Sequence, residues 1–343
     1  MKAAILLDQG RLEVRDVPTP VCLEGGVLVK VKACGICTAD LKIVSKGHRA
    51  LVYPRILGHE IAGIVSESRT NIFKTGDRVQ VAPGLKCGKC SHCLSGADNQ
   101  CKDRGIFGFT RDGGFADYVA VPVEGSVTGT LNLLPEDLSD GVATLAEPLA
   151  CCINAQEKVD IKKTDTVLII GGGTLGLLHC FLALEKGIEN IFIAETRPHR
   201  RKTALEFGAE KVFDPADDRF FDLVMDAADP KGVDVIIFAC GQAGLNEKFM
   251  NLLARGGRVS VFSGVSPDLS LMQLDLNLVH YNEIIITGAY GCTAHQNSEA
   301  VKILASGKLP VGKLITSRVS LEAIKQGLDH TDSRQGFKSI VEV

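Results

Sequence analysis

The feature that most constrains the fold lies at residues 166–195, where a strand, a glycine-rich turn, a helix and a second strand follow one another. The apolar run Thr166–Ile170 predicts the first strand, and a longer apolar run from about Leu177 predicts the helix. Asn190–Ala194 predicts the second strand, and Glu195 follows it directly. A strand–helix–strand unit of this kind indicates a parallel sheet with helices on its faces, and therefore an α/β fold.

The turn inside this unit has the spacing Gly-x-Gly-x-x-Gly. Between a strand and a helix, such a turn lets a pyrophosphate approach the helix N-terminus, and its last glycine lets helix and strand pack closely. The acid at the end of the second strand lies 19 residues past that glycine and can accept hydrogen bonds from ribose hydroxyls. The residues predicted to bind a dinucleotide are Gly171, Gly173, Thr174, Leu175, Gly176 and Glu195.

Further apolar runs predict four more strands at 211–213, 233–238, 258–262 and 283–288, with a helix over 245–253. Together with the first two, they make six strands, which is the size of a full dinucleotide-binding sheet. We therefore predict a doubly wound, six-stranded Rossmann-type sheet over the second half of the chain.

The first 150 residues have short apolar runs separated by glycine turns, which predicts a mostly β, barrel-like or sandwich domain. The tail holds two predicted helices, at 297–304 and 321–328, and a strand at 338–343. These elements are too few to form a core, so we expect the tail to complete the first domain. The predicted domains are 1–150 with 289–343, and 151–288.

Four of the 12 cysteines fall between residues 87 and 101, separated by two, two and seven residues. Four thiolates at such spacing are typical of a closed, tetrahedral, structural zinc site. Iron–sulfur ligation also uses four cysteines, but those runs typically have a shorter final spacing and end in Cys-Pro. The predicted ligands are Cys87, Cys90, Cys93 and Cys101.

A second group of metal-ligating side chains is spread along the first domain. Cys37 follows the predicted strand 27–33, His59 and Glu60 precede a strand signal at 61–66, and Glu147 lies further on. Any one of them alone is more often a buried or hydrogen-bonded group. A thiolate, an imidazole and a carboxylate on one cation make a zinc site of the open, catalytic kind.

The formal net charge of −3 favours neither nucleic acid nor an anionic membrane as a partner. No window approaches the roughly 18 apolar residues that a membrane helix needs. We therefore expect a cytoplasmic protein whose partner is a small molecule.

These motifs, in this order, resemble the zinc-containing medium-chain alcohol dehydrogenases, in particular the polyol (sorbitol) and threonine dehydrogenase branch. The resemblance covers the whole chain, and its signatures are Gly35-Ile-Cys37-x-x-Asp40, Gly58-His59-Glu60-x-x-Gly63, Gly76-Asp77-Arg78-Val79, the four-cysteine loop, Gly113 to Tyr118, Glu147-Pro148-Leu149 and Gly171 to Gly176. It implies a GroES-like catalytic domain with a Rossmann domain. It also implies a homo-oligomer, tetramer or dimer, in which hydride passes between an alcohol or carbonyl substrate and NAD(P).

The resemblance also assigns roles. Cys37 and His59 match the ligands of the catalytic zinc, Glu60 matches a glutamate that ligates it in some members, and Glu147 matches a carboxylate that binds it directly or through water. The four-cysteine loop matches the structural zinc, which makes two zinc ions per chain.

On the cofactor side, Glu195 matches the ribose-binding acid and Arg200 an adenosine-side arginine. Ala289 and Tyr290 stand where the sorbitol-type branch has an Arg-Tyr pair that contacts polyol hydroxyls, and we count both among the cofactor-side candidates. NAD is expected because a carboxylate at residue 195 repels the extra phosphate of NADP, although Arg197 and Arg200 leave NADP open.

One departure concerns the proton relay. Where the family usually has Ser or Thr two residues after the ligand cysteine, this chain has Ala39, and a histidine often found further on is Lys42. Our hypothesis is that Thr38 or a water replaces the usual hydroxyl, with Lys42 assisting. Three functions stay open: a polyol or sugar-type alcohol dehydrogenase, an L-threonine 3-dehydrogenase, and a zinc- and dinucleotide-binding protein with impaired catalysis.

Overall fold

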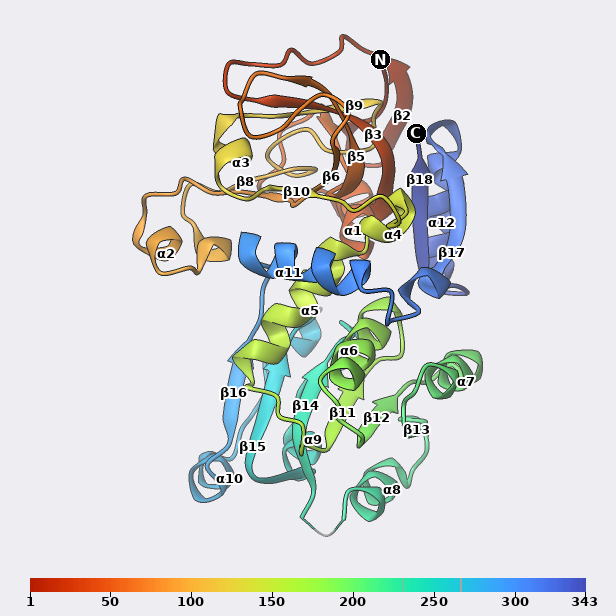
Figure 1. Ribbon diagram of the computed structural model, residues 1–343. Coiled ribbons are helices and arrows are strands. Elements are labelled where there is room, and N and C mark those ends of the chain that lie inside the picture. Colours follow the sequence, from red (N-terminus) through yellow and green to blue (C-terminus); the bar gives the residue numbers. More distant parts are fainter. Residues whose placement is uncertain (230, 266) are drawn as a thin grey trace. The chain divides into compact units, whose positions relative to one another are not determined.

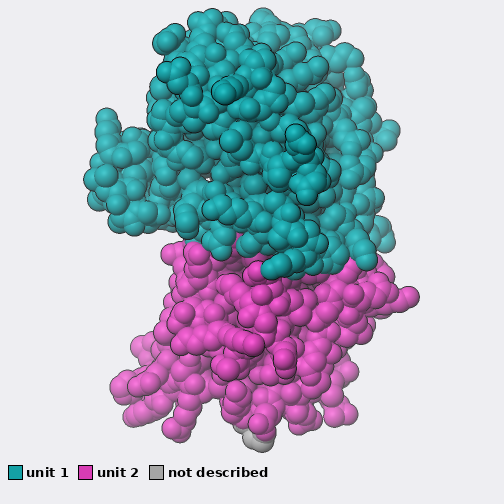
Figure 2. Space-filling model, in the orientation of Figure 1, with its two compact units in different colours: residues 1–150, 292–343 teal, residues 151–291 magenta. Residues whose placement is uncertain are grey.

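The computed structural model describes residues 1–229, 231–265 and 267–343, which form two compact units. Unit 1 comprises Met1–Ala150 and Cys292–Val343, and unit 2 comprises Cys151–Gly291 (Figure 2). Helix α5 (Ala146–Lys158) carries the chain from unit 1 into unit 2 (Figure 1). No helix in the described part of the chain combines the length and apolar composition needed to cross a membrane.

Unit 1 is mostly β, as predicted. Its largest sheet has the strand order β10-β6-β5-β3-β18-β17, and β9 also pairs with β3. Two smaller sheets have the orders β2-β1-β4 and β7-β8. The strands are β1 (Lys2–Asp8), β2 (Arg11–Asp16), β3 (Val27–Ile36), β4 (Arg55–Ile56), β5 (Glu60–Ser68), β6 (Arg78–Val81), β7 (Gly84–Leu85), β8 (Gly105–Ile106), β9 (Tyr118–Val121), β10 (Leu131–Leu133), β17 (Ile315–Ser320) and β18 (Lys338–Glu342).

The C-terminal tail supplies β17 and β18, and β18 pairs antiparallel with β3. Strand β17 lies in a stretch where the sequence predicted no strand. Its residues alternate between half-buried and exposed, and this partial burial leaves a weak apolar signal. The helices of unit 1, with short 3₁₀ turns marked η, are α1 (Thr38–Lys46), α2 (Ser91–Leu94), η1 (Asp98–Gln100), α3 (Val123–Val127), α4 (Asp140–Ala143), α11 (Ala294–Ala305), η3 (Val311–Leu314), η4 (Leu321–Ala323) and α12 (Ile324–Ser333).

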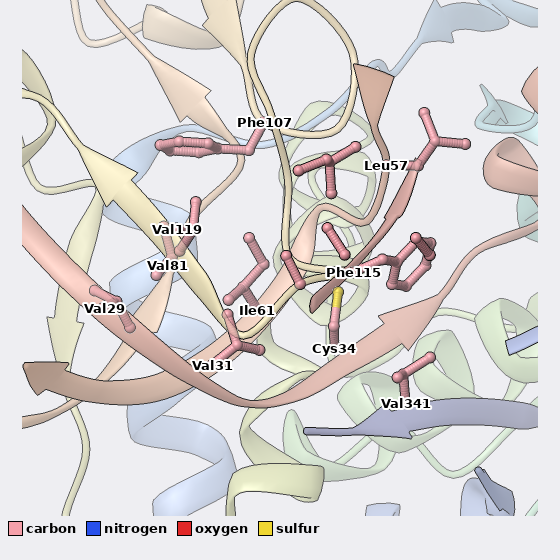
Figure 3. Packing of buried hydrophobic residues seen from close by; sticks show 14 of the residues in the cluster. Val29, Val31, Cys34, Leu57, Ile61, Val81, Phe107, Phe115, Val119 and Val341 are labelled. Atoms are coloured by element: carbon pink, nitrogen blue, oxygen red, sulfur yellow. The ribbon is translucent and has the colours of Figure 1, made fainter. Parts of the chain in front are cut away.

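The core of unit 1 gathers around the central strands β3 and β5 (Figure 3). Cys34, Leu57 and Ile61 are fully buried there, and Phe115 packs against the same cluster. Because β3 has neighbours on both sides, it is buried along most of its length, and its two ends are held in place by pairing rather than by side chains alone. This rigid centre carries the candidate metal ligands.

Unit 2 is a parallel sheet of six strands in the order β13-β12-β11-β14-β15-β16, which confirms the predicted Rossmann-type sheet. The strand order reverses between β11 and β14, and ligands of such sheets bind at the carboxyl ends of the strands at this point. The elements are β11 (Val167–Ile170), α6 (Thr174–Glu185), β12 (Ile191–Ala194), α7 (Pro198–Glu206), β13 (Lys211–Phe213), α8 (Phe220–Ala227), β14 (Val233–Phe238), α9 (Glu247–Met250), β15 (Leu253–Val261), η2 (Pro267–Leu269), α10 (Leu276–Asn282) and β16 (Ile285–Gly288).

The helix predicted over 245–253 was wrong in length. Helix α9 is a single turn, and the chain is already paired with β14 at Leu253. Phe249, Met250 and Leu252 are buried in the core of unit 2, so the apolar run reflects their burial and does not indicate how long the helix is. Short apolar runs cannot distinguish the two.

Candidate metal centres and dinucleotide site

The first group of candidate ligands lies where β3 and β5 meet. Cys37 caps α1 directly after β3, and His59 and Glu60 lie at the start of β5. The register of the two strands pairs Gly35 with Glu60. The potential ligand atoms of Cys37, His59 and Glu60 lie within 4.8 Å of one another, with His59 and Glu60 buried and Cys37 half-buried. The sulfur, nitrogen and oxygen donors fit a zinc ion.

Asp40 contacts two members of this group, Cys37 and His59. Its carboxylate Oδ2 accepts a hydrogen bond from the Cys37 amide at 2.9 Å, and Oδ1 lies 3.5 Å from Nδ1 of His59. A carboxylate beside one imidazole nitrogen is typical of metal-ligating histidines, whose other nitrogen binds the metal. Burial lowers the pKa of His59, but the charges of Asp40 and Cys37 outweigh burial and raise that pKa well above its ordinary value.

Glu60 has a partner that the sequence did not suggest. Nζ of Lys338, at the start of β18, donates to Oε1 of Glu60 at 2.5 Å, and both side chains are buried. Burial lowers the pKa of Lys338, and the negative charges of Glu60, Cys37 and Glu147 outweigh it and raise the pKa. A buried ammonium therefore stands beside the candidate ligands.

Glu147 is not part of the group around Cys37. It lies in the first turn of α5, and its carboxylate is within 4.8 Å of the thiol of Cys292, at the start of the tail. Its charge still acts on Lys338, because it contributes to the raised pKa of that ammonium. The structure thus places Glu147 beside the group without bringing it into the group.

The proton-relay candidates lie on α1. Thr38 is its first residue and Lys42 follows one turn later, and both side chains are exposed.

Beside the candidate ligands, the ring of Phe109 lies 5.3 Å from that of His59 and 5.5 Å from that of His48, measured between ring centres. Phe109 therefore gives the neighbourhood of His59 an apolar wall.

The second group is the four-cysteine loop around α2 and η1. The sulfurs of Cys87, Cys90, Cys93 and Cys101 lie within 4.8 Å of one another, with 3.9 Å between Cys87 and Cys93 and 3.5 Å between Cys90 and Cys93. A tetrahedral ion with Zn–S bonds of about 2.3 Å separates its sulfurs by roughly 3.8 Å. Both separations are close to this value, so the arrangement of the four thiols is compatible with one zinc ion.

The local backbone prepares one of these thiols for a metal. The amide of Cys93 donates to the sulfur of Cys90 and lowers the pKa of Cys90 to about 6, whereas burial raises the pKa of Cys93 to about 12. A thiolate is the form that ligates metal. The loop is held to the rest of unit 1 by Asp98, which pairs with Lys86 at 2.6 Å and accepts from the amide of Ala294 at 3.1 Å.

The dinucleotide candidates lie at the carboxyl ends of β11 and β12 in unit 2. The turn 171–173 joins β11 to α6, and a Cβ on Gly176 would overlap the carbonyl oxygen of Gly171, so only glycine allows this turn and helix to pack. Glu195 directly follows β12, and its Oε2 accepts from the amide of Gly172 at 2.9 Å. The acid and the turn therefore belong to one site.

The other candidates of unit 2 surround or follow this site. Oε1 of Glu195 accepts from the amide of Arg197 at 2.9 Å. A guanidinium nitrogen of Arg200 would lie 3.3 Å from a Cβ on Gly173, so its charge is next to the turn. Ala289 is buried directly after β16, and Tyr290 is exposed.

Comparisons with known proteins agree with this architecture. The model of the alcohol dehydrogenase GroES-like domain matches residues 23–130, and that of zinc-binding dehydrogenases matches residues 174–306. L-threonine 3-dehydrogenase of Pyrococcus furiosus is 33% identical over 309 residues, covering 88% of this chain and 86% of its own. Sorbitol dehydrogenase of Bacillus subtilis is 28% identical over 335 residues, covering 96% and 93%.

A solved structure gives the same result. A Sinorhizobium meliloti 1021 protein assigned as a zinc-binding dehydrogenase, bound to NADP, superimposes with a TM-score of 0.89 at 30% identity and covers 100% of this chain and 99% of its own. A two-part fold with a metal-ligating β unit and a dinucleotide sheet defines a dinucleotide-linked oxidoreductase. The chain belongs to the zinc-containing medium-chain alcohol dehydrogenases, enzymes that act on CH–OH donors.

We predict that Asp40→Asn lowers the pKa of His59 in protein stripped of metal, because it removes the charge that opposes burial. A raised folded-state pKa stabilises the protein below the unfolded-state pKa, and this stability is lost as the pH rises through the folded value. The substitution should remove this pH dependence. NMR titration of the imidazole measures the pKa of His59 in both proteins. His179, whose pKa burial lowers to about 3, is the control, and its pKa should be the same in both. An unchanged pKa for His59 would contradict the role of Asp40.

Proposed function

We propose that this chain is a zinc-dependent dehydrogenase that moves hydride between the secondary hydroxyl of a polyol or sugar-type alcohol and NAD. The observation that carries the proposal is the grouping of the half-buried Cys37 with the buried His59 and Glu60, supported by Asp40. The glycine turn of unit 2, whose Gly172 amide donates to Glu195, supplies the second requirement, a place for the nicotinamide dinucleotide. Unit 1 is then the catalytic domain and unit 2 the dinucleotide domain.

In this proposal, Cys37 and His59 hold the catalytic zinc, with Glu60 beside it and Glu147 bound directly or through water. Cys87, Cys90, Cys93 and Cys101 hold a second zinc, whose role is structural. When bound, the catalytic zinc supplies Lewis acidity to the oxygen of the substrate. The metal content of the purified chain tests this assignment.

The remaining steps belong to the chain. Asp40 keeps the imidazole of His59 in one orientation, and Phe109 lines the space beside it with an apolar ring. The secondary alcohol loses a proton from its oxygen and a hydride from its carbon, and the products are a ketone and the reduced nicotinamide. We propose that Thr38 or a water takes the proton, with Lys42 assisting its passage to solvent. Both side chains are exposed, as a path to solvent requires.

L-threonine 3-dehydrogenase is the second candidate. The 33% identity with the Pyrococcus furiosus enzyme favours it, whereas the sorbitol dehydrogenase relative favours a polyol. The missing arginine before Tyr290 weakens sorbitol itself as the substrate. Ala39 is the one feature that favours impaired catalysis, and the intact donor groups argue against it.

We also propose a homo-oligomer. Strand β16 is an edge strand of the unit 2 sheet, and the side chains of Ile285 and Ile286 on it are exposed. An exposed apolar edge is unusual in a protein that stays monomeric, because it can pair with another chain.

The proposal predicts two zinc ions per chain and cofactor-linked turnover of at least one member of a panel of polyols, sugar phosphates and threonine. Cys37→Ser should leave one ion and abolish turnover, and Cys90→Ser should also remove one ion. Cys22→Ser changes a buried thiol outside both groups and should leave two ions and full turnover. Elemental analysis and absorbance of the reduced nicotinamide measure both quantities. A wild-type chain with a single zinc would show that the catalytic group is misassigned.

Cofactor choice should depend on Glu195. We predict that Glu195→Gln lowers kcat/KM for NAD by about 10- to 100-fold, since hydrogen bonds donated to a charged acceptor contribute roughly 1.5–3 kcal/mol. The loss for NADP should be smaller, because the repelling charge is gone. Glu206→Gln, on the exposed side of α7, is the control. Wild-type enzyme that prefers NADP by more than about tenfold would overturn the assignment of NAD.

The relay should show in the pH dependence of the rate. We predict that Thr38→Ala and Lys42→Ala lower the rate more at low pH than at high pH, since hydroxide can replace a missing proton acceptor only when it is abundant. Lys46→Ala, in the last turn of the same helix, should leave the profile unchanged. Profiles in both relay variants that match wild type would remove these residues from the mechanism.

A further inference from the structure

The ion pair between Glu60 and Lys338 is built across the central strand of unit 1. Strands β5 and β18 flank β3 on opposite sides, and Gly35 of β3 pairs with Glu60 on one side and with Ile340 on the other. A Cβ on Gly35 would overlap Oε2 of Glu60 and lie 3.0 Å from Cε of Lys338. The two side chains therefore meet over the one residue of β3 that leaves room for them.

Water is excluded from this pair. Glu60 is 0% exposed and Lys338 5% exposed, so the ammonium has few alternatives to the carboxylate. Both carboxylate oxygens face Nζ, and Oε1 accepts its hydrogen bond at 2.5 Å. Removing one partner of such a buried pair leaves an uncompensated charge, so each partner strongly constrains where the other lies.

The same carboxylate is also within reach of a metal. One oxygen of Glu60 lies within 4.8 Å of the ligand atoms of both Cys37 and His59. Two cations can therefore compete for Glu60: the ammonium of Lys338 and a divalent ion held by Cys37 and His59. A catalytic zinc keeps a position for substrate beside its protein ligands, and an additional carboxylate ligand would raise the coordination number and crowd that position.

We propose that Lys338 is a positioning residue that keeps Glu60 out of the coordination of the catalytic metal. This inference rests on the proposed function, since it presumes a divalent ion at Cys37 and His59. Lys338 neutralises Glu60 and holds it over Gly35, so that the carboxylate supports the site without occupying the position that substrate requires. Without Lys338, the metal is the nearest cation, and Glu60 turns to it.

The test is cobalt-for-zinc exchange in the holoenzyme, because the visible absorption of cobalt(II) weakens markedly when a four-coordinate ion gains a fifth ligand. Lys338→Met should weaken the absorption of the catalytic cobalt, slow loss of the metal to a chelator at least fivefold, and lower kcat more than it raises KM. Glu60→Gln should keep the wild-type spectrum, since Glu60 is not a ligand while Lys338 is present. The double variant Glu60→Gln/Lys338→Met should regain the wild-type spectrum because neither charge remains.

Glu342→Gln removes an exposed charge from the same strand and controls for damage to β18. An unchanged spectrum and metal-loss rate in Lys338→Met would overturn the proposal, as would faster metal loss. A changed spectrum in Glu60→Gln alone would also overturn it, and that variant stays informative if Lys338→Met does not fold. A wild-type chain without a second metal ion would instead remove the proposed function itself, which separates the two failures.

Discussion

The pairing of β3 with β5 is the constraint on which the metal-ligating part of the molecule depends. It brings Cys37, which follows one strand, next to His59 and Glu60, which begin the other. The ladder is irregular in two places, between Leu28 and Val29 and between Val31 and Ala33. Because the side-chain period of a strand is two residues, a slip of one residue would turn Glu60 to the opposite face. The geometry of the ligands is therefore a property of backbone register.

Much of the fold was predictable from sequence because its signals are local. The strands β13 and β14 have the predicted bounds, and the central strands β12, β11 and β14 of the parallel sheet follow from apolar runs that are buried almost throughout. The four-cysteine loop was predictable for the same reason, since its ligands fall within one short segment and its spacing alone brings the sulfurs together.

What the sequence did not show depends on contacts between distant segments. Lys338 lies 278 residues from Glu60, and a single lysine at the start of a strand carries no signal of a buried partner. Glu147 lies on the first turn of a helix, where its direction depends on how that helix packs. Asp40 could have been recognised, because an acid three residues after a helix-capping Cys37 completes a capping box that also faces His59.

The charges around Cys37 give an argument for a cation that is independent of any motif. Asp40 and Glu60 are fully buried, Glu147 is nearly so, and one ammonium, that of Lys338, stands among them. Burial of several carboxylates is unfavourable unless positive charge accompanies them. The charges of Asp40 and Cys37 raise the pKa of His59 in spite of its burial, so the protonated imidazole is favoured in the protein without metal. A divalent ion binds only neutral imidazole, so it would replace this proton. Its two positive charges would then neutralise more of the surrounding negative charge than the proton does. The environment that makes His59 basic is thus one that would also favour a bound divalent ion.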